Sequence, residues 1–208
     1  MTSAVIIQAR LGSKRFHGKV LAPLAGKRVL ERVLEQALRI DTDEIILAVP
    51  VGCAALLDVA RGYSIKTFEG PADDVLSRYF LAAQAQAIDI VMRITADCPL
   101  IDPQLCNKVL DLYREGGCKY AAIGWPQGGF PKGYGCEVFS FKTLELADQL
   151  AVTDEDREHV TTWMQRNVRC QYLQNDTDES HHNYCIDYPE DITRIEKIIA
   201  EREQIRQD

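Results

Sequence analysis

Short apolar runs typical of strands alternate with amphipathic stretches typical of helices over the first two-thirds of the chain. Four of the apolar runs are predicted strands: 4–9, 44–49, 64–68 and 89–95. Four amphipathic stretches are predicted helices: 30–38, 53–61, 73–87 and the stretch that Asp102-Pro103 opens. Strands that alternate with helices favour an α/β protein in which helices cover both faces of a mostly parallel, mixed sheet.

The pattern weakens after Tyr120. Residues 124–135 contain five glycines and two prolines, which predicts a loop or a set of tight turns. The elements expected beyond this loop are a strand at 137–141, a helix at 154–167, a short strand at 183–188 and a last helix that Pro189 starts. We therefore predict a single domain over 1–208, with a loop and strand appendage around 124–167.

Composition excludes several classes of protein. The 208 residues carry a formal net charge of −7, which argues against a broad basic face for nucleic acid. The seven cysteines are scattered without a Cys-x-x-Cys pair, which argues against a disulfide framework or a zinc ribbon and fits a cytoplasmic protein. We expect neither a signal peptide nor a membrane span, because no apolar run approaches the roughly 18 residues that a span needs.

A basic loop follows the first predicted strand. Ten residues, 10–19, contain four permanent cations: Arg10, Lys14, Arg15 and Lys19. Gly12 and Gly18 allow backbone conformations that direct N–H groups at a ligand. Ligands of open α/β sheets bind at the carboxyl ends of the strands, so the loop is suited to a polyphosphate. The alternative is a solvated basic loop.

The loop matches neither of the common phosphate-binding patterns. Five residues separate Gly12 from Gly18, and Val20 follows Lys19, so it is not a Walker A loop. The chain also contains no Gly-x-Gly-x-x-Gly fingerprint of dinucleotide-binding proteins.

Two aspartates are candidate metal ligands. Asp97 follows the predicted strand 89–95 and should face the same sheet edge as the basic loop. Asp187 also stands at a predicted strand end before a proline, although it could equally serve as the N-cap of the last helix. Mg²⁺ typically takes one or two carboxylates together with phosphates and waters, which these two residues would supply.

Several sequence blocks, in order, carry a resemblance to a known family. They are 8–15 with 18–21, 73–79, 93–103, 137–139, 157–161 and 187–191. Over nearly its whole length the chain resembles the cytidylyltransferase family typified by the spore coat polysaccharide biosynthesis cytidylyltransferases. That family is related to the acylneuraminate and 3-deoxy-manno-octulosonate cytidylyltransferases.

The resemblance implies a three-layer, Rossmann-like nucleotide-diphospho-sugar transferase fold, a Mg²⁺ cofactor and a homodimer. It implies an enzyme that couples CTP to a sugar or sugar-like acceptor, releases pyrophosphate and serves polysaccharide or glycan precursor synthesis. The nucleotide-binding residues that it implies are Ala9, Arg10, Leu11, Gly12, Ser13, Arg15, Lys19, Asp73 and Asp74. The acceptor-binding residues are Arg93, Glu137 and His159, and the appendage would serve acceptor binding or dimerisation. Asp97 and Asp187 would bind the metal and, with Arg10 and Lys19, carry the catalysis.

The chain departs from the family pattern at two places. Two other functions are alternatives to this interpretation. The family has Leu-Pro where this chain has Phe16-His17, and Gly-Leu-Asp where it has 133–135. His159 could be a general base or a packing residue. The rivals are a glycosyltransferase that uses a nucleotide-sugar donor and a non-catalytic nucleotide-binding protein on the same fold.

Overall fold

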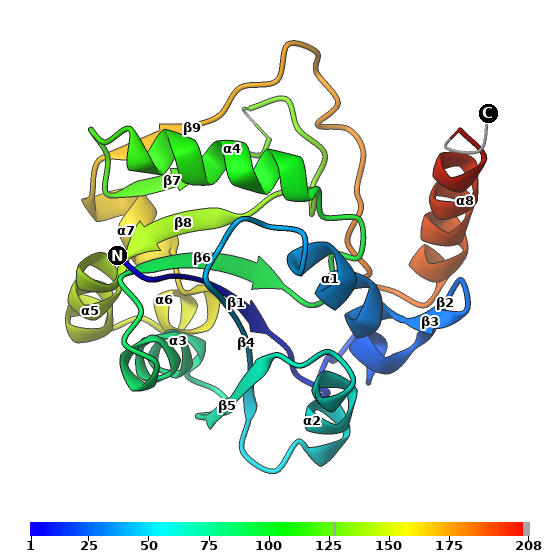
Figure 1. The fold of residues 1–208 in the computed structure, drawn as a ribbon, viewed down its shortest axis with the longest axis horizontal. Coiled ribbons are helices and arrows are strands. Elements are labelled where there is room, and N and C mark those ends of the chain that lie inside the picture. The colour runs from blue at the N-terminus through cyan, green and yellow to red at the C-terminus, as the bar shows by residue number, and fades with distance from the viewer. Residues whose placement is uncertain (127, 206–208) are drawn as a thin grey trace.

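A mixed seven-stranded sheet forms the centre of the protein (Figure 1), whose computed structural model describes residues 1–126 and 128–205. In spatial order the strands are β5 (Lys66–Gly70), β4 (Glu44–Pro50), β1 (Ser3–Gln8), β6 (Ile90–Thr95), β8 (Glu137–Ser140), β7 (Tyr120–Ala122) and β9 (Cys170–Tyr172). The first four strands are parallel, β8 runs antiparallel to both of its neighbours, and β7 pairs parallel with β9. The predicted mostly parallel, mixed sheet is confirmed.

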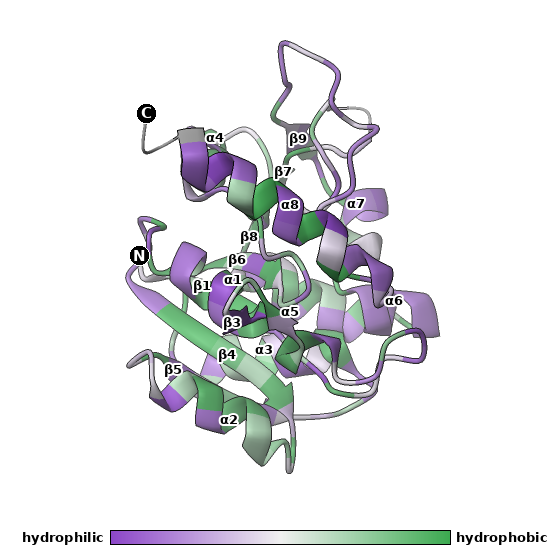
Figure 2. Cartoon of the chain, turned by 90° about the vertical axis from the view of Figure 1, so that its right-hand side faces the viewer, coloured by the Kyte–Doolittle hydropathy of each residue, from purple (hydrophilic) through white to green (hydrophobic). Residues whose placement is uncertain are grey.

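Helices cover both faces of the sheet and make three layers. One face packs against α1 (Val29–Ala37), α2 (Ala54–Arg61) and α4 (Pro103–Arg114). The other packs against α3 (Val75–Ala85), α5 (Phe141–Leu150) and α7 (Thr162–Asn167). Alternate residues of β1 enter the two cores, with Val5 and Ile7 on one face and Ala4 and Ile6 on the other. Because both faces are buried, β1 and β4 are apolar almost throughout, as the hydropathy colours of Figure 2 show for β4.

The order of the strands determines where a ligand can bind. The chain moves from β1 to β4 and β5 on one side, and then returns to place β6 on the other side of β1. The connections after β1 and β6 therefore leave the sheet at the same edge and in opposite directions. Such a reversal of strand order opens a crevice at the carboxyl ends of the strands.

A smaller third core lies outside the layers. The hairpin of β2 (Pro23–Leu24) and β3 (Lys27–Arg28) packs beside α8 (Glu190–Ile205), as Figure 1 shows at the right. Buried Leu24 of the hairpin and Ile195 of the helix belong to this core. The packing brings the C-terminal segment back to the basic loop that follows β1.

Several predicted element boundaries are confirmed. Asp102 accepts hydrogen bonds from the N–H groups of Gln104 and Leu105, so it caps α4 as predicted. Asp74 accepts a hydrogen bond of 2.9 Å from the N–H of Ser77 and caps α3.

Three predictions about secondary structure are wrong. The predicted helix 154–167 is broken into α6 (Asp154–His159) and α7, because Val160 takes a left-handed φ of 67°. The predicted strand 183–188 is extended but forms only one isolated bridge, between Asn183 and Lys132. The strand expected at 64–68 is displaced towards the C-terminus and forms β5.

The range 124–167, in which we expected a loop and strand appendage, contributes elements to the main layers. Its strand β8 pairs with β6 near the middle of the sheet, and α5 and α7 cover one face. The described residues of the glycine-rich loop, 124–126 and 128–135, form turns and one isolated bridge. Within the described residues, no helix is long and apolar enough to cross a bilayer.

Candidate active site

Two adjoining cavities open at the carboxyl edge of the sheet. The smaller, of about 410 Å³, lies over the loop after β1, and the larger, of about 600 Å³, lies over β6, β7 and β8. Four residues line both cavities: Arg93, Thr95, Lys132 and Cys185. Two ligands could therefore meet at this shared boundary.

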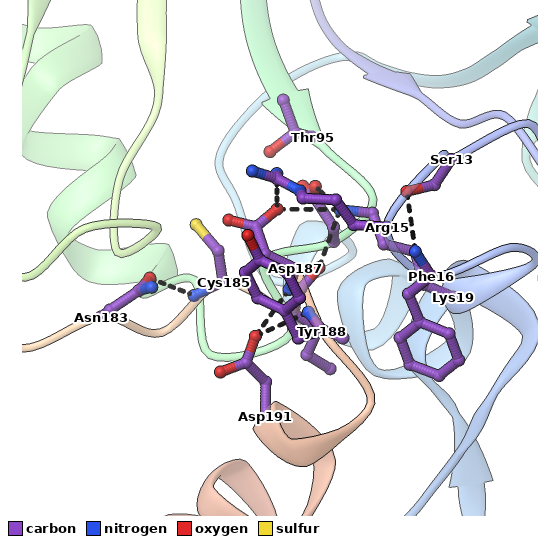
Figure 3. Close-up of polar contacts among 12 residues, drawn as sticks. Ser13, Arg15, Phe16, Lys19, Thr95, Asn183, Cys185, Asp187, Tyr188 and Asp191 are labelled. Carbon is purple, nitrogen blue, oxygen red and sulfur yellow. Dashed lines mark hydrogen bonds and ion pairs between the residues drawn. The ribbon is translucent and has the colours of Figure 1, made fainter.

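Lys19 connects the basic loop with both predicted metal ligands, and Figure 3 labels Lys19, Arg15 and Asp187 of this cluster. Its Nζ lies 2.6 Å from Oδ2 of Asp97 and 3.2 Å from Oδ1 of Asp187. It also donates a hydrogen bond of 2.7 Å to the main-chain oxygen of Ile186. The expectation that Asp97 and the basic loop face the same edge of the sheet is confirmed. Two aspartates that are 90 residues apart in the sequence contact one ammonium group.

The surrounding cations keep Asp187 ionised. Nη2 of Arg15 lies 2.6 Å from Oδ1 of this carboxylate, and Nζ of Lys132 lies 3.5 Å from Oδ2. Burial opposes the charge of Asp187, but Lys19, Lys132 and Arg15 outweigh it and lower the pKa of the carboxyl group. Burial also opposes the charge of Lys19, yet the two aspartates raise the pKa of its ammonium.

Asp187 is not the N-cap of α8, which was the alternative role for it. The carboxylate of Asp191 accepts the hydrogen bonds from the N–H groups of Asp187 and Tyr188, at 2.8 and 2.9 Å. The Asp187 carboxylate is directed instead at the cations of the cavity.

The backbone of the basic loop folds onto itself. The carbonyl oxygen of Leu11 accepts hydrogen bonds of 2.9 Å from both Ser13 and Gly18. Gly18 takes a left-handed φ of 68°, which a residue with a side chain rarely adopts, and a short 3₁₀ helix, η1 (Lys19–Leu21), follows it. Phe16, where the family has leucine, packs against the third core and fixes the loop from outside the cavity.

The opposite wall of the smaller cavity comes from α6. Nη2 of Arg10 lies 2.7 Å from Oε1 of Glu158, and both side chains are about half exposed. His159, which is predicted to bind the acceptor, lines this smaller cavity.

The oxygen atoms around Lys19 suit Mg²⁺. Two carboxylates and one carbonyl surround a single small cation, and Mg²⁺ prefers oxygen ligands of this kind. Within residues 1–126 and 128–205, no group of three or more His, Cys, Asp or Glu side chains forms a complete metal site. Phosphate oxygens and water would have to complete the coordination of a metal on Asp97 and Asp187.

A buried polar cluster forms the floor of the larger cavity. Glu137 forms an ion pair with Arg93 and accepts hydrogen bonds of 2.6 Å from Tyr120 and Thr161. Burial opposes its charge, but Arg93, Thr161 and Tyr120 outweigh burial and lower the pKa of Glu137. Because these partners occupy the carboxylate, Glu137 organises the floor rather than offering a free acceptor to a ligand.

The break between α6 and α7 contributes directly to this cluster. Val160 is fully buried at its left-handed φ, a conformation that costs energy for a β-branched residue. The turn places Thr161 against Glu137 and Glu158 against Arg10, so one short segment touches both cavities.

The glycine-rich loop closes the larger cavity. Lys132 lies over the ring of Trp125, with Nζ 5.8 Å from the ring centroid. A Cβ atom on Gly133 would lie 2.6 Å from Sγ of Cys185, so only glycine fits there. Tyr134, in the segment that departs from the family pattern, turns away and packs edge-on against Tyr184.

The structure brings most of the predicted site residues to the two cavities. The smaller cavity is lined by Ala9, Arg10, Ser13, Arg15, Lys19, Asp97, His159 and Asp187, and Arg93 lines both cavities. Leu11 and Gly12 lie in the same loop without lining a described cavity. Neither Asp73 nor Asp74 lines one of the two cavities: Asp73 is exposed, and Asp74 is held by the guanidinium of Arg157, with Nε at 2.9 Å.

Three side chains at the site were missed by reasoning from the sequence. Lys132 lines both cavities, and its only signal is a cation within a loop rich in glycine. Trp125, in the same loop, is 46% exposed at the edge of the larger cavity. Arg78 is almost fully buried below the smaller cavity and donates a hydrogen bond of 2.6 Å to the carbonyl of Pro71.

A cationic cleft at the reversal point of a doubly wound sheet, with two convergent carboxylates, defines an α/β protein of the nucleotide-binding class. A profile of the cytidylyltransferase family matches residues 4–207. The chain belongs to the cytidylyltransferase family.

Two relatives illustrate this membership. The chain is 33% identical over 165 residues to the uncharacterised protein MJ1063 of Methanocaldococcus jannaschii, covering 78% of this chain and 66% of that protein. It is 30% identical over 182 residues to the spore coat polysaccharide biosynthesis protein SpsF of Bacillus subtilis, covering 81% and 73%. The chain spans about half the length of a related 3-deoxy-manno-octulosonate cytidylyltransferase of Anaeromyxobacter, with 36% identity over 127 residues.

Solved structures share the fold. A cytidylyltransferase from Leptospira borgpetersenii superposes with a TM-score of 0.90 at 28% identity, over 97% of this chain and 87% of that one. A CMP-2-keto-3-deoxy-manno-octonic acid synthetase in complex with CTP superposes with a TM-score of 0.78 at 16% identity, over 97% and 100%. The nucleotide-diphospho-sugar transferase fold that the sequence implied is confirmed.

Proposed function

We propose that the protein transfers the cytidylyl group of CTP to a sugar or sugar-like acceptor and releases pyrophosphate. The observation that carries this proposal is the pair of adjoining cavities, one cationic and one with aromatic walls, that share Lys132 and Arg93 at their boundary. Family membership, together with the complex that the structurally similar synthetase forms with CTP, supports cytidine as the nucleoside.

The chemistry proposed is in-line attack by an acceptor hydroxyl on the α-phosphorus of CTP. An acceptor in the larger cavity would face a triphosphate in the smaller one, so the protein contributes mainly orientation and charge neutralisation. Arg15 and Lys19 would hold phosphate oxygens, and the ion pair of Arg93 with Glu137 would keep the floor of the acceptor cavity rigid. Asp97 and Asp187 would hold Mg²⁺, which when bound neutralises charge on phosphate oxygens.

The proton of the attacking hydroxyl would pass to solvent water or to a phosphate oxygen rather than to a side chain of the two cavities. His159 is exposed on the nucleotide side, and Glu137 is occupied by its protein partners. A homodimer and a cytoplasmic location belong to the same proposal, by analogy with the family.

A screen of nucleotides against acceptors tests the function. The protein would be incubated with Mg²⁺, each NTP in turn and a panel of ulosonic acids, other sugars and sugar phosphates, and pyrophosphate would be measured. Pyrophosphate release with CTP and one acceptor supports the proposal. Transfer from a nucleotide-sugar would support a glycosyltransferase, and nucleotide binding without turnover would support a non-catalytic protein.

The basic loop gives a prediction about CTP affinity. Lys19→Ala and Arg10→Ala should each weaken CTP binding, and Lys19→Ala should weaken it more, because Lys19 is buried at the centre of the site and Arg10 is half exposed. Lys14→Ala is the matched control, since Lys14 is exposed and does not line the cavity. Calorimetric titration of CTP measures the difference, and equal affinity in all three variants would exclude a phosphate site in this loop.

Nucleotide preference gives a second prediction. CTP with Mg²⁺ should raise the melting temperature more than ATP or GTP with Mg²⁺, because a ligand that binds only the folded state adds RT ln(1 + [L]/Kd) to its stability. Small Ala9, at the end of β1, would let a pyrimidine approach the backbone. UTP is the closest competitor, because uracil differs from cytosine at one exocyclic position, where a carbonyl acceptor replaces an amino donor. Stronger stabilisation by a purine nucleotide would contradict the cytidylyl assignment and leave nucleotidyl transfer open.

A further inference from the structure

Three protein cations already neutralise the two carboxylates that could hold a divalent metal. Lys19 contacts both Asp97 and Asp187, while Arg15 and Lys132 contact Asp187. The local balance is three positive charges against two negative ones. A free divalent cation would therefore enter a group of side chains that is positive before the metal arrives.

Lys19 is fixed where a metal would have to bind. Its side chain is buried and its ammonium lies within 3.2 Å of three oxygen atoms. The backbone is held as well, because the N–H of Lys19 donates to the carbonyl of Phe16 and its own carbonyl accepts from Ala22. The ammonium can leave the carboxylates only if another group of anions receives it.

A triphosphate is such a group. Its oxygen atoms carry several negative charges, and they would attract Lys19 and Arg15 away from the aspartates. The same anions would reverse the sign of the local charge and offer the remaining ligands that Mg²⁺ needs. Metal and nucleotide would then bind together although neither carboxylate is free beforehand.

We infer that Asp97 and Asp187 accept a divalent metal only as part of a metal–nucleoside triphosphate complex, and that Lys19 is the residue that excludes free metal. The inference rests on the proposed function, because it assumes that a triphosphate binds in the smaller cavity. Under this inference, Asp97 and Asp187 hold no metal ion between turnovers.

Manganese alone, without nucleotide, is the probe that tests this exclusion. Binding would be followed by loss of the electron paramagnetic resonance signal of free Mn²⁺. Lys19→Met and Lys19→Gln should bind Mn²⁺ about tenfold more tightly than the wild type, or tighter still, because a positive charge in contact with the ligands is removed. Lys14→Met, which removes an exposed cation of the same loop, should match the wild type.

A double variant identifies where the gained metal binds. Lys19→Met combined with Asp97→Asn should lose the gain, while circular dichroism and melting curves show whether each variant is folded. The inference is overturned if the wild type binds free Mn²⁺ as tightly as folded Lys19→Met and Lys19→Gln do, or if the gain survives in the double variant.

Equilibrium dialysis of CTP separates this inference from the proposed function. Wild-type protein should retain CTP and Mn²⁺ together when both are present. If the wild type retains no CTP, the proposed function fails. The comparison of Mn²⁺ binding without nucleotide still decides whether Lys19 excludes the metal.

Discussion

Asp97→Asn should lower turnover by about 10²- to 10³-fold, the scale seen when one charge-stabilising group is removed from an active site. The substitution keeps the size of the side chain but removes the charge that faces Lys19 at 2.6 Å. Lys19 retains Asp187 and the carbonyl of Ile186 as partners, so the melting temperature should change little. Pyrophosphate release with CTP, Mg²⁺ and the acceptor found by screening measures the loss.

Asp73→Asn is the matched control for this experiment. Asp73 is an exposed aspartate of a family block that lines neither cavity, so its removal should leave turnover near the wild-type value. Asp187→Asn should behave like Asp97→Asn. A well-folded Asp97→Asn protein with unchanged Mg²⁺-dependent turnover would remove this residue from the mechanism.

Glu137→Ala should destabilise the fold by about 3 kcal/mol, the lower end of the range for breaking a buried ion pair. The substitution leaves the guanidinium of Arg93 without its carboxylate, and the Arg93 side chain is only 13% exposed. It also leaves the hydroxyl groups of Tyr120 and Thr161 without their acceptor. Urea denaturation, analysed for the free energy of unfolding, measures the effect.

Two further variants show whether burial is the cause. Asp58→Ala breaks an ion pair with Arg61 whose side chains are 58% and 77% exposed, and it should cost less than about 1 kcal/mol. Arg93→Leu combined with Glu137→Ala should be less destabilising than the sum of the single variants, because no unpaired charge remains. Equal losses for Glu137→Ala and Asp58→Ala would contradict the role of the buried pair.

The effect of Glu137 should depend on pH in a definite direction. The pKa of this carboxyl group in the folded protein lies below its ordinary value of 4.5. Its contribution to stability is therefore fully present above about pH 4.5 and is lost as the pH falls through the folded-state pKa. The difference between wild type and Glu137→Ala should shrink in acid, below pH 4.5.

The basic loop and Asp97 could be placed at one edge from sequence because local signals agreed. The strands before them are apolar runs, and parallel strands end at the same edge of a sheet. The helix caps Asp74 and Asp102 were also within reach, because capping depends only on the next few residues. These features depend on contacts that are near in sequence or on a general rule of α/β topology.

The same local reasoning failed where distant segments decide the conformation. One helix was predicted over 154–167, but the chain turns at Val160, next to the Thr161 that bonds to Glu137. The 183–188 segment has the composition of a strand, yet it crosses the site and bonds to Asp97 through the N–H of Ile186. Lys132 could not be recognised, because its importance comes only from the two cavities that it lines.

The sequence by itself determined the class of fold, the family and the presence of a cationic loop near a strand-end aspartate. Apolar periodicity, turn residues and motif order are properties of neighbouring residues, and the sequence displays them directly. The tertiary structure alone decided that Asp97 and Asp187 converge on Lys19, and that the Asp187 carboxylate faces cations rather than capping the last helix. Packing of the β2–β3 hairpin against α8 brings these groups together. The sequence of neither segment indicates that it packs against the other.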